Sequence, residues 1–111
     1  MASILICEAD PDVRRLLIVL MERAGHDAIV LEPDAEVPPL ADVLLLEPAA
    51  QRCVDEAWHI RLFRPDLPIV CMGPAPDGAA FLRHGPVTFL EKPFTVEALA
   101  AAVTAFVASP V

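Results

Sequence analysis

The chain has 111 residues, a length that suits a single domain (residues 1–111) with a sizeable core. Hydrophobic residues make up 56% of it, but it has neither a run of about 18 apolar residues nor a basic segment before an apolar one, so we expect a cytoplasmic protein without a membrane span or signal peptide. The formal net charge of -8 argues against nucleic acid as a partner, because such binding depends on Lys and Arg neutralising phosphates.

The N-terminal part of the chain predicts a strand, an acidic turn, a helix and a second strand. The apolar run Ser3–Cys7 is the first strand, and Ala28–Leu31 is the second. Asp10 is a good helix N-cap, Pro11 suits the first turn, and Gly25 is expected to end the helix. The apolar residues that recur at helical spacing, and that we expect to face the core, are Val13, Leu16, Leu17, Leu20 and Ala24.

The next segment, Glu32–Ala41, contains Pro33, Pro38 and Pro39. A helix of any length is not expected there, because proline breaks helices in their interior. At most one helical turn is predicted, around Asp34–Val37.

An unbroken apolar run, Val43–Leu46, predicts a strand that is buried on both faces, as in a parallel sheet covered by helices. The run ends on a carboxylate, Glu47, which is followed by Pro48. This carboxylate therefore stands at the carboxyl end of the strand, the edge where open α/β folds keep their sites.

The C-terminal half continues the alternation of helices and strands. Its first helix has Val54, Trp58 and Leu62 at four-residue spacing. The expected elements are a helix over Val54–Phe63, a strand over Leu67–Met72, a short helix over Asp77–His84 that Gly85 ends, a strand over Val87–Leu90 and a helix capped by Thr95 that runs to about Ala108. Strands and helices that alternate with short connections predict a parallel sheet with helices on both faces.

In such a sheet the ends of the first, third and fifth strands converge, and here they carry Glu8, Glu47 and Lys92. With this constellation, the chain resembles the receiver domain of two-component response regulators (CheY-like) over its whole length. The stretches that carry the resemblance are ILICEADPDVRRLL, ADVLLLEP, PIVCMG and FLEKPF. The resemblance implies a flavodoxin-like, three-layer, doubly wound fold with a five-stranded parallel sheet in the order 2-1-3-4-5. The proline-rich segment implies that the second helix of that fold is shortened or absent.

The resemblance also implies roles for residues. Receivers of a phosphorelay accept a phosphoryl group from a histidine kinase onto an Asp after the third strand, next to a Mg²⁺ held by two acids after the first strand. A hydroxyl after the fourth strand and a Lys after the fifth contact the phosphoryl oxygens. These positions fall on Glu47 for the acceptor, Glu8 and Ala9 for the acids, Gly73 for the hydroxyl, Lys92 for the lysine and Phe89 for the aromatic switch residue.

Three of these positions depart from the family's pattern. The Glu47 carboxylate lies one methylene further out than that of Asp, and a displacement of about 1 Å can cost about a hundredfold in rate. Ala9 removes a carboxylate that Mg²⁺ needs, so we expect the Mg²⁺ site to be lost and no cofactor or catalytic residue to remain. Gly73 removes the hydroxyl. We therefore expect an atypical pseudo-receiver that is not phosphorylated and is not an enzyme.

Two interpretations of the remaining charges stay open. We expect Lys92 to reach between Glu8 and Glu47 and to form ion pairs with them. These ion pairs either mimic part of the charge of a phosphorylated state or only neutralise the carboxylates of the pocket. If Asp10 replaces the missing acid, or Glu47 accepts phosphate, the chain is a conventional phosphoacceptor receiver. A third possibility is a small-ligand sensor that uses the acidic edge as a pocket with an apolar rim of Pro48, Pro74, Pro76 and Phe94.

The cysteines and histidines do not predict a metal site. Cys7, Cys53 and Cys71 are far apart and odd in number, which favours buried, reduced thiols over a disulfide or a metal site. The three histidines, His26, His59 and His84, share no spacing with one another or with acidic neighbours.

Two helix surfaces are candidates for binding a protein partner. The first helix carries apolar residues beyond its core stripe: Ile18, Val19 and Met21. The last helix presents a smooth outer face that includes Ala101, Thr104, Ala105 and Ala108. The resemblance makes the first surface a candidate for a histidine kinase or another regulator, and the second a candidate homodimer surface. We expect a stand-alone regulator that acts through at least one such contact.

Overall fold

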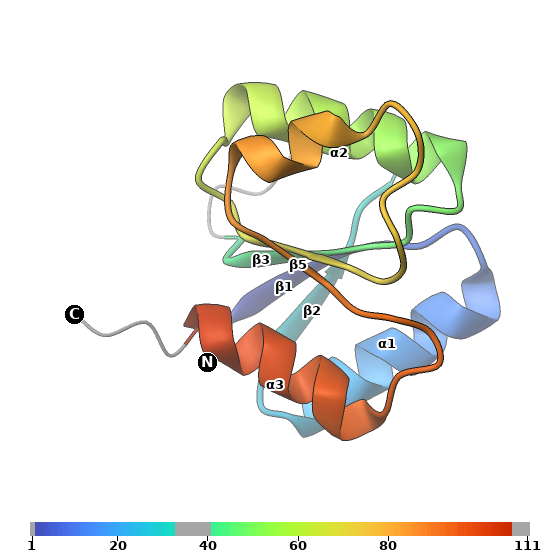
Figure 1. The fold of residues 1–111 in the computed structure, drawn as a ribbon. Coiled ribbons are helices and arrows are strands. Elements are labelled where there is room, and N and C mark those ends of the chain that lie inside the picture. The colour runs from blue at the N-terminus through green and yellow to red at the C-terminus, as the bar shows by residue number, and fades with distance from the viewer. Residues whose placement is uncertain (1, 33–40, 108–111) are drawn as a thin grey trace.

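The computed structural model describes residues 2–32 and 41–107. Its five strands form one parallel sheet in the order β2-β1-β3-β4-β5, which confirms the predicted flavodoxin-like fold. The strands are β1 (Ser3–Cys7), β2 (Asp27–Val30), β3 (Val43–Leu46), β4 (Ile69–Cys71) and β5 (Val87–Phe89). The helices are α1 (Pro11–Arg23), α2 (Gln51–Phe63), the 3-10 helix η1 (Ala80–His84) and α3 (Val96–Val107). Helices α1 and α3 cover one face of the sheet, and α2 with η1 covers the other (Figure 1).

The central strand β3 is fully buried, as its apolar run predicts. Its residues alternate between two cores, because successive side chains of a strand point to opposite faces. Leu44 and Leu46 belong to the core beneath α2 and η1, whereas Val43 and Leu45 belong to the core beneath α1 and α3. Both faces therefore need apolar residues, and the alternation with polar residues that marks a half-exposed strand is missing.

Helix α1 begins and ends where its capping residues predict. The Asp10 Oδ1 accepts hydrogen bonds from the backbone nitrogens of Asp12 at 2.9 Å and Val13 at 3.4 Å. Gly25, just after the helix, has a φ of 88°, a conformation that glycine adopts at little cost. Local signals of this kind act over a few residues and do not depend on the rest of the fold.

The prediction of which side of α1 faces the core was partly wrong. Leu17 is buried as expected, but Val13 and Leu16 are 40% and 56% exposed. Met21, a candidate contact residue, is buried at 1% exposure instead. The row that packs on the sheet is Leu17 and Met21, one turn apart, because the helix is rotated about its axis relative to the expected stripe.

Helix α2 begins at Gln51, three residues earlier than predicted. Its apolar Trp58 and Leu62 do not face the core and are 48% and 59% exposed. The buried face carries Cys53, Ala57, Ile60 and Arg61. Small side chains near its N-terminus let this helix pack closely on the sheet, and this packing turns the larger ones outward.

Arg61 is a buried residue whose structural role the sequence analysis missed. Its guanidinium donates four hydrogen bonds to backbone carbonyls, those of Pro65 (3.1 Å), Leu67 (2.7 Å), Leu82 (3.1 Å) and Pro86 (2.6 Å). Burial lowers the pKa of this guanidinium. A Cβ on Gly85 would lie 2.6 Å from its Nη1 atom, so glycine at 85 leaves the space that Arg61 needs. Arg61 therefore links α2 to the segment before β4, to the middle of η1 and to the residue before β5.

Several element boundaries differ from the predicted ones. Strand β2 is shifted by one residue toward the N-terminus, and β4 and β5 are shorter than expected. The short helix predicted over Asp77–His84 is a 3-10 helix that begins three residues later. The backbone N–H of Ala79 donates to Pro76 O, and that of Leu82 donates to Ala79 O. Each bond spans three residues, the spacing of a 3-10 helix, and not the four of an α-helix.

Some expectations fall outside the described residues. The proline-rich segment, with the turn predicted over Asp34–Val37 and the shortened second helix, lies on residues 33–40. Ala108 also lies outside them. Among the helices of the described part, none has the length and apolar character that crossing a bilayer requires.

Candidate functional site

The carboxyl edge of the sheet brings Glu8 and Glu47 together. Strands β1 and β3 pair in parallel with Cys7 opposite Leu46, so the residue after each strand reaches the same edge. The backbone N–H of Glu47 donates to the Cys7 carbonyl at 3.0 Å and extends this pairing by one residue. Both glutamates are buried, at 6% and 7% exposure.

Lys92, which follows β5, holds the Glu47 carboxylate with two contacts. Its Nζ atom lies 2.9 Å from Oε1 and 2.8 Å from Oε2 of Glu47. The Lys92 side chain is half exposed, while that of Glu47 is only 10% exposed. The charge of this buried carboxylate is therefore neutralised by a lysine that approaches from the solvent side.

The expected bridge from Lys92 to Glu8 does not form among the described residues. The Glu8 Oε1 instead accepts a hydrogen bond from the backbone N–H of Asp10 at 3.0 Å. The Asp10 side chain caps α1, and its Oδ1 accepts hydrogen bonds from the first turn of that helix. The structure thus brings Glu47 and Lys92 together and leaves Glu8 in contact with the loop that follows β1.

The acidic edge is a poor magnesium site. Mg²⁺ prefers carboxylate and water oxygens in octahedral geometry, but both Glu47 oxygens already bind Lys92. Ala9, at the position of the second acid, is exposed and offers no side-chain oxygen as a ligand. Within residues 2–32 and 41–107, no group of three or more His, Cys, Asp or Glu could hold a metal ion. These residues do not fit the metal that receiver chemistry uses.

Gly73, at the hydroxyl position, has a backbone conformation that few other residues adopt. Its φ is 143°, and a Cβ there would lie 3.4 Å from Pro48 Cγ. Side chains are strained in this region of φ, so a serine or threonine would not fit without a change of the backbone. The geometry of this loop therefore favours glycine at position 73.

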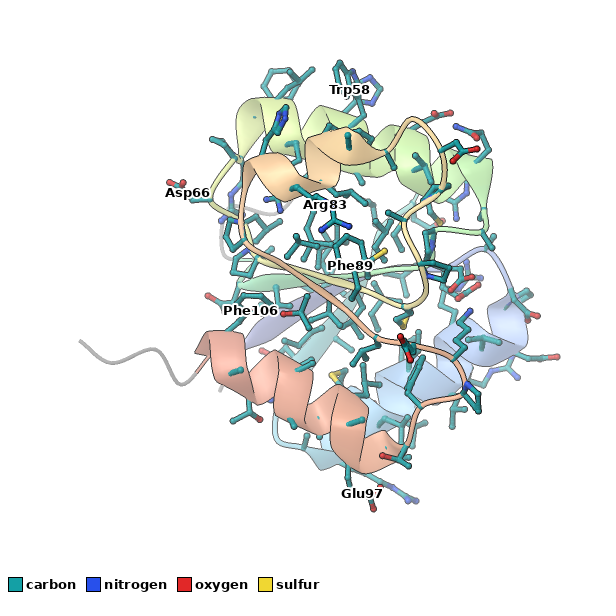
Figure 2. All side chains as sticks on the ribbon, viewed as in Figure 1. Trp58, Asp66, Arg83, Phe89, Glu97 and Phe106 are labelled. Atoms are coloured by element: carbon teal, nitrogen blue, oxygen red, sulfur yellow. The ribbon has the colours of Figure 1, made fainter. Side chains whose placement is uncertain are left out.

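Phe89 lies beneath an arginine. The guanidinium of Arg83 from η1 lies over the Phe89 ring, 4.7 Å from its centroid, in a cation–π contact (Figure 2). Both residues line a cavity of about 610 Å³, together with Gly73, Pro74, Ala75, Leu90, Glu91 and Lys92. The sequence contained no signal for this contact, because η1 and β5 meet only in the tertiary structure.

The apolar rim predicted around the acidic edge divides between two further cavities. Three of its members, Pro48, Pro74 and Pro76, line a cavity of about 330 Å³ that also contains Glu47 and Lys92. The fourth, Phe94, lines a cavity of about 170 Å³ whose walls include Glu8, Glu47 and Lys92 as well as apolar side chains of α1 and α3.

The three thiols lie in the core beneath α2, close to the acidic edge. All three cysteines are free and buried, as predicted. A hydrogen bond to the Cys53 thiol, together with burial, raises the pKa of Cys7. Burial, and next the charge of Glu47, raises the pKa of Cys71 to about 11. Cys7 and Cys71 therefore remain neutral thiols at neutral pH.

The candidate interface residues differ in their exposure. Ile18 is half-buried, Val19 is 39% exposed, and Met21 lies in the core. The three members of the α3 surface that the structure describes, Ala101, Thr104 and Ala105, are exposed as expected. Larger apolar surface on this side of the molecule comes from Val13 and Leu16, which were expected to face the core, and from Val96, for which no role was predicted.

No protein-family model matches the sequence, and a comparison with curated proteins found no match. Solved structures, however, share its fold. A response regulator receiver domain protein from Clostridium thermocellum has a TM-score of 0.79 at 16% identity, over 97% of this chain and 95% of that one. A two-component response regulator from Clostridium difficile has a TM-score of 0.73 at 22% identity, over 97% of each chain.

NtrX from Brucella abortus, solved in complex with ADP, has a TM-score of 0.78 at 21% identity. This match covers 97% of the present chain but only 26% of NtrX, so the chain spans about a quarter of that protein. At such identities the likeness shows the fold alone. The chain therefore has the fold seen in response regulator receiver domains.

Proposed function

We propose that this chain is an atypical receiver domain of a two-component signalling system that acts by protein contact and not by phosphorylation. The shared fold supports the receiver assignment. The observation that carries the rest is the ion pair in which Lys92 binds both oxygens of Glu47. It stands where the resemblance places the phosphoacceptor and its lysine.

The geometry of this pair opposes phosphoryl transfer. An attacking carboxylate must approach the phosphorus in line, with cations that stabilise the charge on the transferred group. Both Glu47 oxygens are engaged by Lys92, and the residue is only 7% exposed. Attack would require breaking the ion pair, without the second acid that Ala9 replaces. The arrangement therefore favours a stable charge pair over a reactive site.

If the ion pair of Glu47 and Lys92 is stable, this site has a single conformation and does not switch between two states. A carboxylate has neither the charge nor the three acceptor oxygens of a phosphate, and Gly73 provides no hydroxyl to respond to either. We propose that the domain instead presents a constant surface to a partner protein. The exposed apolar residues Val13 and Leu16 of α1 and Val96 of α3 are part of that surface, and they line one cavity together with Glu8 and Glu47. A histidine kinase or another regulator is the partner class that this position suits.

Phosphoryl chemistry is tested by incubation with acetyl phosphate and Mg²⁺, followed by intact-mass measurement, and by beryllofluoride binding. The expected result for the wild-type chain is neither a phosphoryl adduct nor a beryllofluoride complex. The matched control is the double variant Ala9→Asp with Glu47→Asp, which restores the acidic pair and shortens the acceptor. A wild-type adduct that Glu47→Gln abolishes would show a conventional phosphoacceptor and overturn the proposal.

The partner surface is tested by affinity capture followed by mass spectrometry, with wild type and Leu16→Glu compared side by side. Leu16 is 56% exposed, so the substitution places a charge on the surface without disturbing the core. A partner captured by wild type and lost with Leu16→Glu supports contact through α1. Equal capture of the partner by wild type and by Leu16→Glu would show that the partner does not bind through this part of α1.

A small-ligand sensor is a second candidate, favoured by the cavities around the loop that begins at Gly73. Cavities of about 610 Å³ and 330 Å³ share Gly73, Pro74, Ala75 and Lys92 in their walls. Their sizes fall in the range of about 300–1,000 Å³ that is usual for ligand pockets. A thermal-shift screen with metabolites and nucleotides tests this candidate. A stabilising compound whose effect is lost in Lys92→Met would support it, and the absence of any stabilisation would count against it.

A further inference from the structure

The outer face of α2 carries three large apolar side chains that remain about half exposed or more in the described structure. Trp58, Leu62 and Phe63 are 48%, 59% and 82% exposed. We call these three residues the α2 ridge. Trp58 and Leu62 are one turn apart on the same face of the helix, and Phe63 follows directly. Figure 2 shows Trp58 projecting outward from α2, on the side of the helix that faces away from the sheet.

The ridge is held in place by the elements around it. The Trp58 ring meets the Phe81 ring edge-on, with centroids 5.3 Å apart and an interplanar angle of 89°. Phe81 belongs to η1 and packs against the core. A shallow cavity of about 340 Å³ lies beside Trp58 and Phe81. A preorganised aromatic group of this kind loses little side-chain entropy when it binds a partner.

The distribution of charge indicates what kind of partner this face can take. Residues 51–84, which contain α2 and η1, carry four basic residues (Arg52, Arg61, Arg64 and Arg83) and four acidic ones (Asp55, Glu56, Asp66 and Asp77). With eight basic and 16 acidic residues in the whole chain, the rest has four and 12, so the entire net charge of -8 lies outside this segment. Two copies of the chain repel each other least when they meet through this segment.

We propose that the α2 ridge is the interface of a homodimer in which two copies pack their α2 helices antiparallel across a two-fold axis. Such an interface is self-complementary, so Trp58 of one copy lies beside Leu62 of the other and the reverse. The inference is independent of the state of Glu47 and Lys92, which lie at the edge of the sheet.

The size of the ridge fits a moderately stable dimer. A large aromatic side chain offers about 150–250 Å² of surface, so at these exposures the ridge presents on the order of 400 Å² of apolar surface. A standard interface takes about 800 Å² from each partner and has an apolar centre with a polar rim. The ridge supplies the centre of such an interface, and the charged residues of both signs around it supply the rim. In contrast, Ala101 and Ala105 of the candidate α3 surface have small side chains and offer little area.

Trp58 is the only tryptophan of the chain, so its fluorescence reports on the ridge directly. The experiment combines light scattering after size exclusion with Trp58 emission and iodide quenching, from low micromolar to near-millimolar protein concentration. The expected result for wild type is a dimer at high concentration, with a blue shift of Trp58 emission and weaker quenching as the dimer forms. A wild type that stays monomeric throughout would overturn the proposal.

Matched variants locate the interface. Leu62→Glu and Phe63→Glu are each expected to raise the dimer dissociation constant about tenfold or more, because residues at the centre of an interface dominate its energy. Both side chains are largely exposed, and a circular dichroism spectrum equal to that of wild type shows that each variant folds. The control is Leu16→Glu on α1, at a similar 56% exposure, which should leave the dimer unchanged. If Ala105→Glu disrupts the dimer while both ridge variants preserve it, the interface is that of α3 and the proposal is wrong.

Discussion

Replacing Arg61 by methionine should destabilise the domain more than any surface substitution. The guanidinium donates to four carbonyl oxygens, and two of these bonds, to Leu67 and Leu82, are buried. Methionine fills much of the space but donates nothing, so those two carbonyls lose their partner where water does not reach easily. Each buried carbonyl left unsatisfied costs about 1–3 kcal/mol.

The other two acceptors, the carbonyls of Pro65 and Pro86, belong to exposed residues and can regain a hydrogen bond from water. They therefore add little to the cost, while the methionine variant avoids the desolvation of a charge. We expect a loss of about 3–4 kcal/mol, a large share of the ~5–15 kcal/mol that stabilises a typical domain.

Urea unfolding followed by Trp58 fluorescence measures this loss. With a slope of about 1–3 kcal/mol/M for a small domain, the midpoint should fall by ~2 M. The control is Arg15→Met, since Arg15 is exposed and makes a 3.6 Å contact with Asp12 that is worth only about 0.5 kcal/mol. The loss of unfolding free energy in Arg61→Lys should lie between the losses in Arg15→Met and Arg61→Met, because an ammonium cannot reach all four carbonyls. A loss below about 1 kcal/mol in Arg61→Met would refute the view that the buried carbonyls depend on this side chain.

Three further predictions concern the site and its surroundings. A double-mutant cycle of Glu47→Gln and Lys92→Met should give a coupling energy of about 1–2 kcal/mol in urea unfolding, and a value near zero would show that the pair is not formed in solution. Gly73→Ser should lower stability by about 1–2 kcal/mol through strain at a φ of 143°, whereas an unchanged unfolding midpoint would mean that the loop can rearrange. Burial raises the pKa of Cys71 from 9.0 to about 11, so unfolding releases a proton at alkaline pH. The contribution of this thiol is therefore complete below pH 9.0 and is lost as the pH rises toward 11, and Cys71→Ala should flatten this part of the curve of unfolding free energy against pH.

Much of the fold could be predicted because its signals are local or repeat along the chain. The apolar run Val43–Leu46 predicted a central strand buried on both faces, and β3 has these same bounds. Asp10 and Gly25 marked the ends of the first helix, and Thr95 caps α3 by accepting a hydrogen bond from Ala98 N at 3.0 Å. Each signal needs only the backbone of its own neighbourhood.

The convergence of Glu8, Glu47 and Lys92 could also be predicted, because parallel strands end at one edge of the sheet. The hydrogen-bond partner of each charged side chain could not be predicted. Lys92 binds both oxygens of Glu47, while Glu8 accepts a backbone N–H of its own loop. Which of two nearby carboxylates a lysine reaches depends on side-chain direction and loop shape, and neither follows from sequence order.

The sequence by itself therefore determined the order of the elements, the central strand and the absence of polar side chains at positions 9 and 73. The tertiary structure alone decided which face of each helix is buried. Met21 is inside while Leu16 is outside, and Phe63 is 82% exposed although it is strongly apolar. The reason is that the rotation of a helix about its axis is set by packing against other elements, here with small Cys53 and Ala57 facing the sheet and Arg61 bound to distant carbonyls. The rotation of α2 leaves the α2 ridge exposed, and with it the surface that we propose for the homodimer.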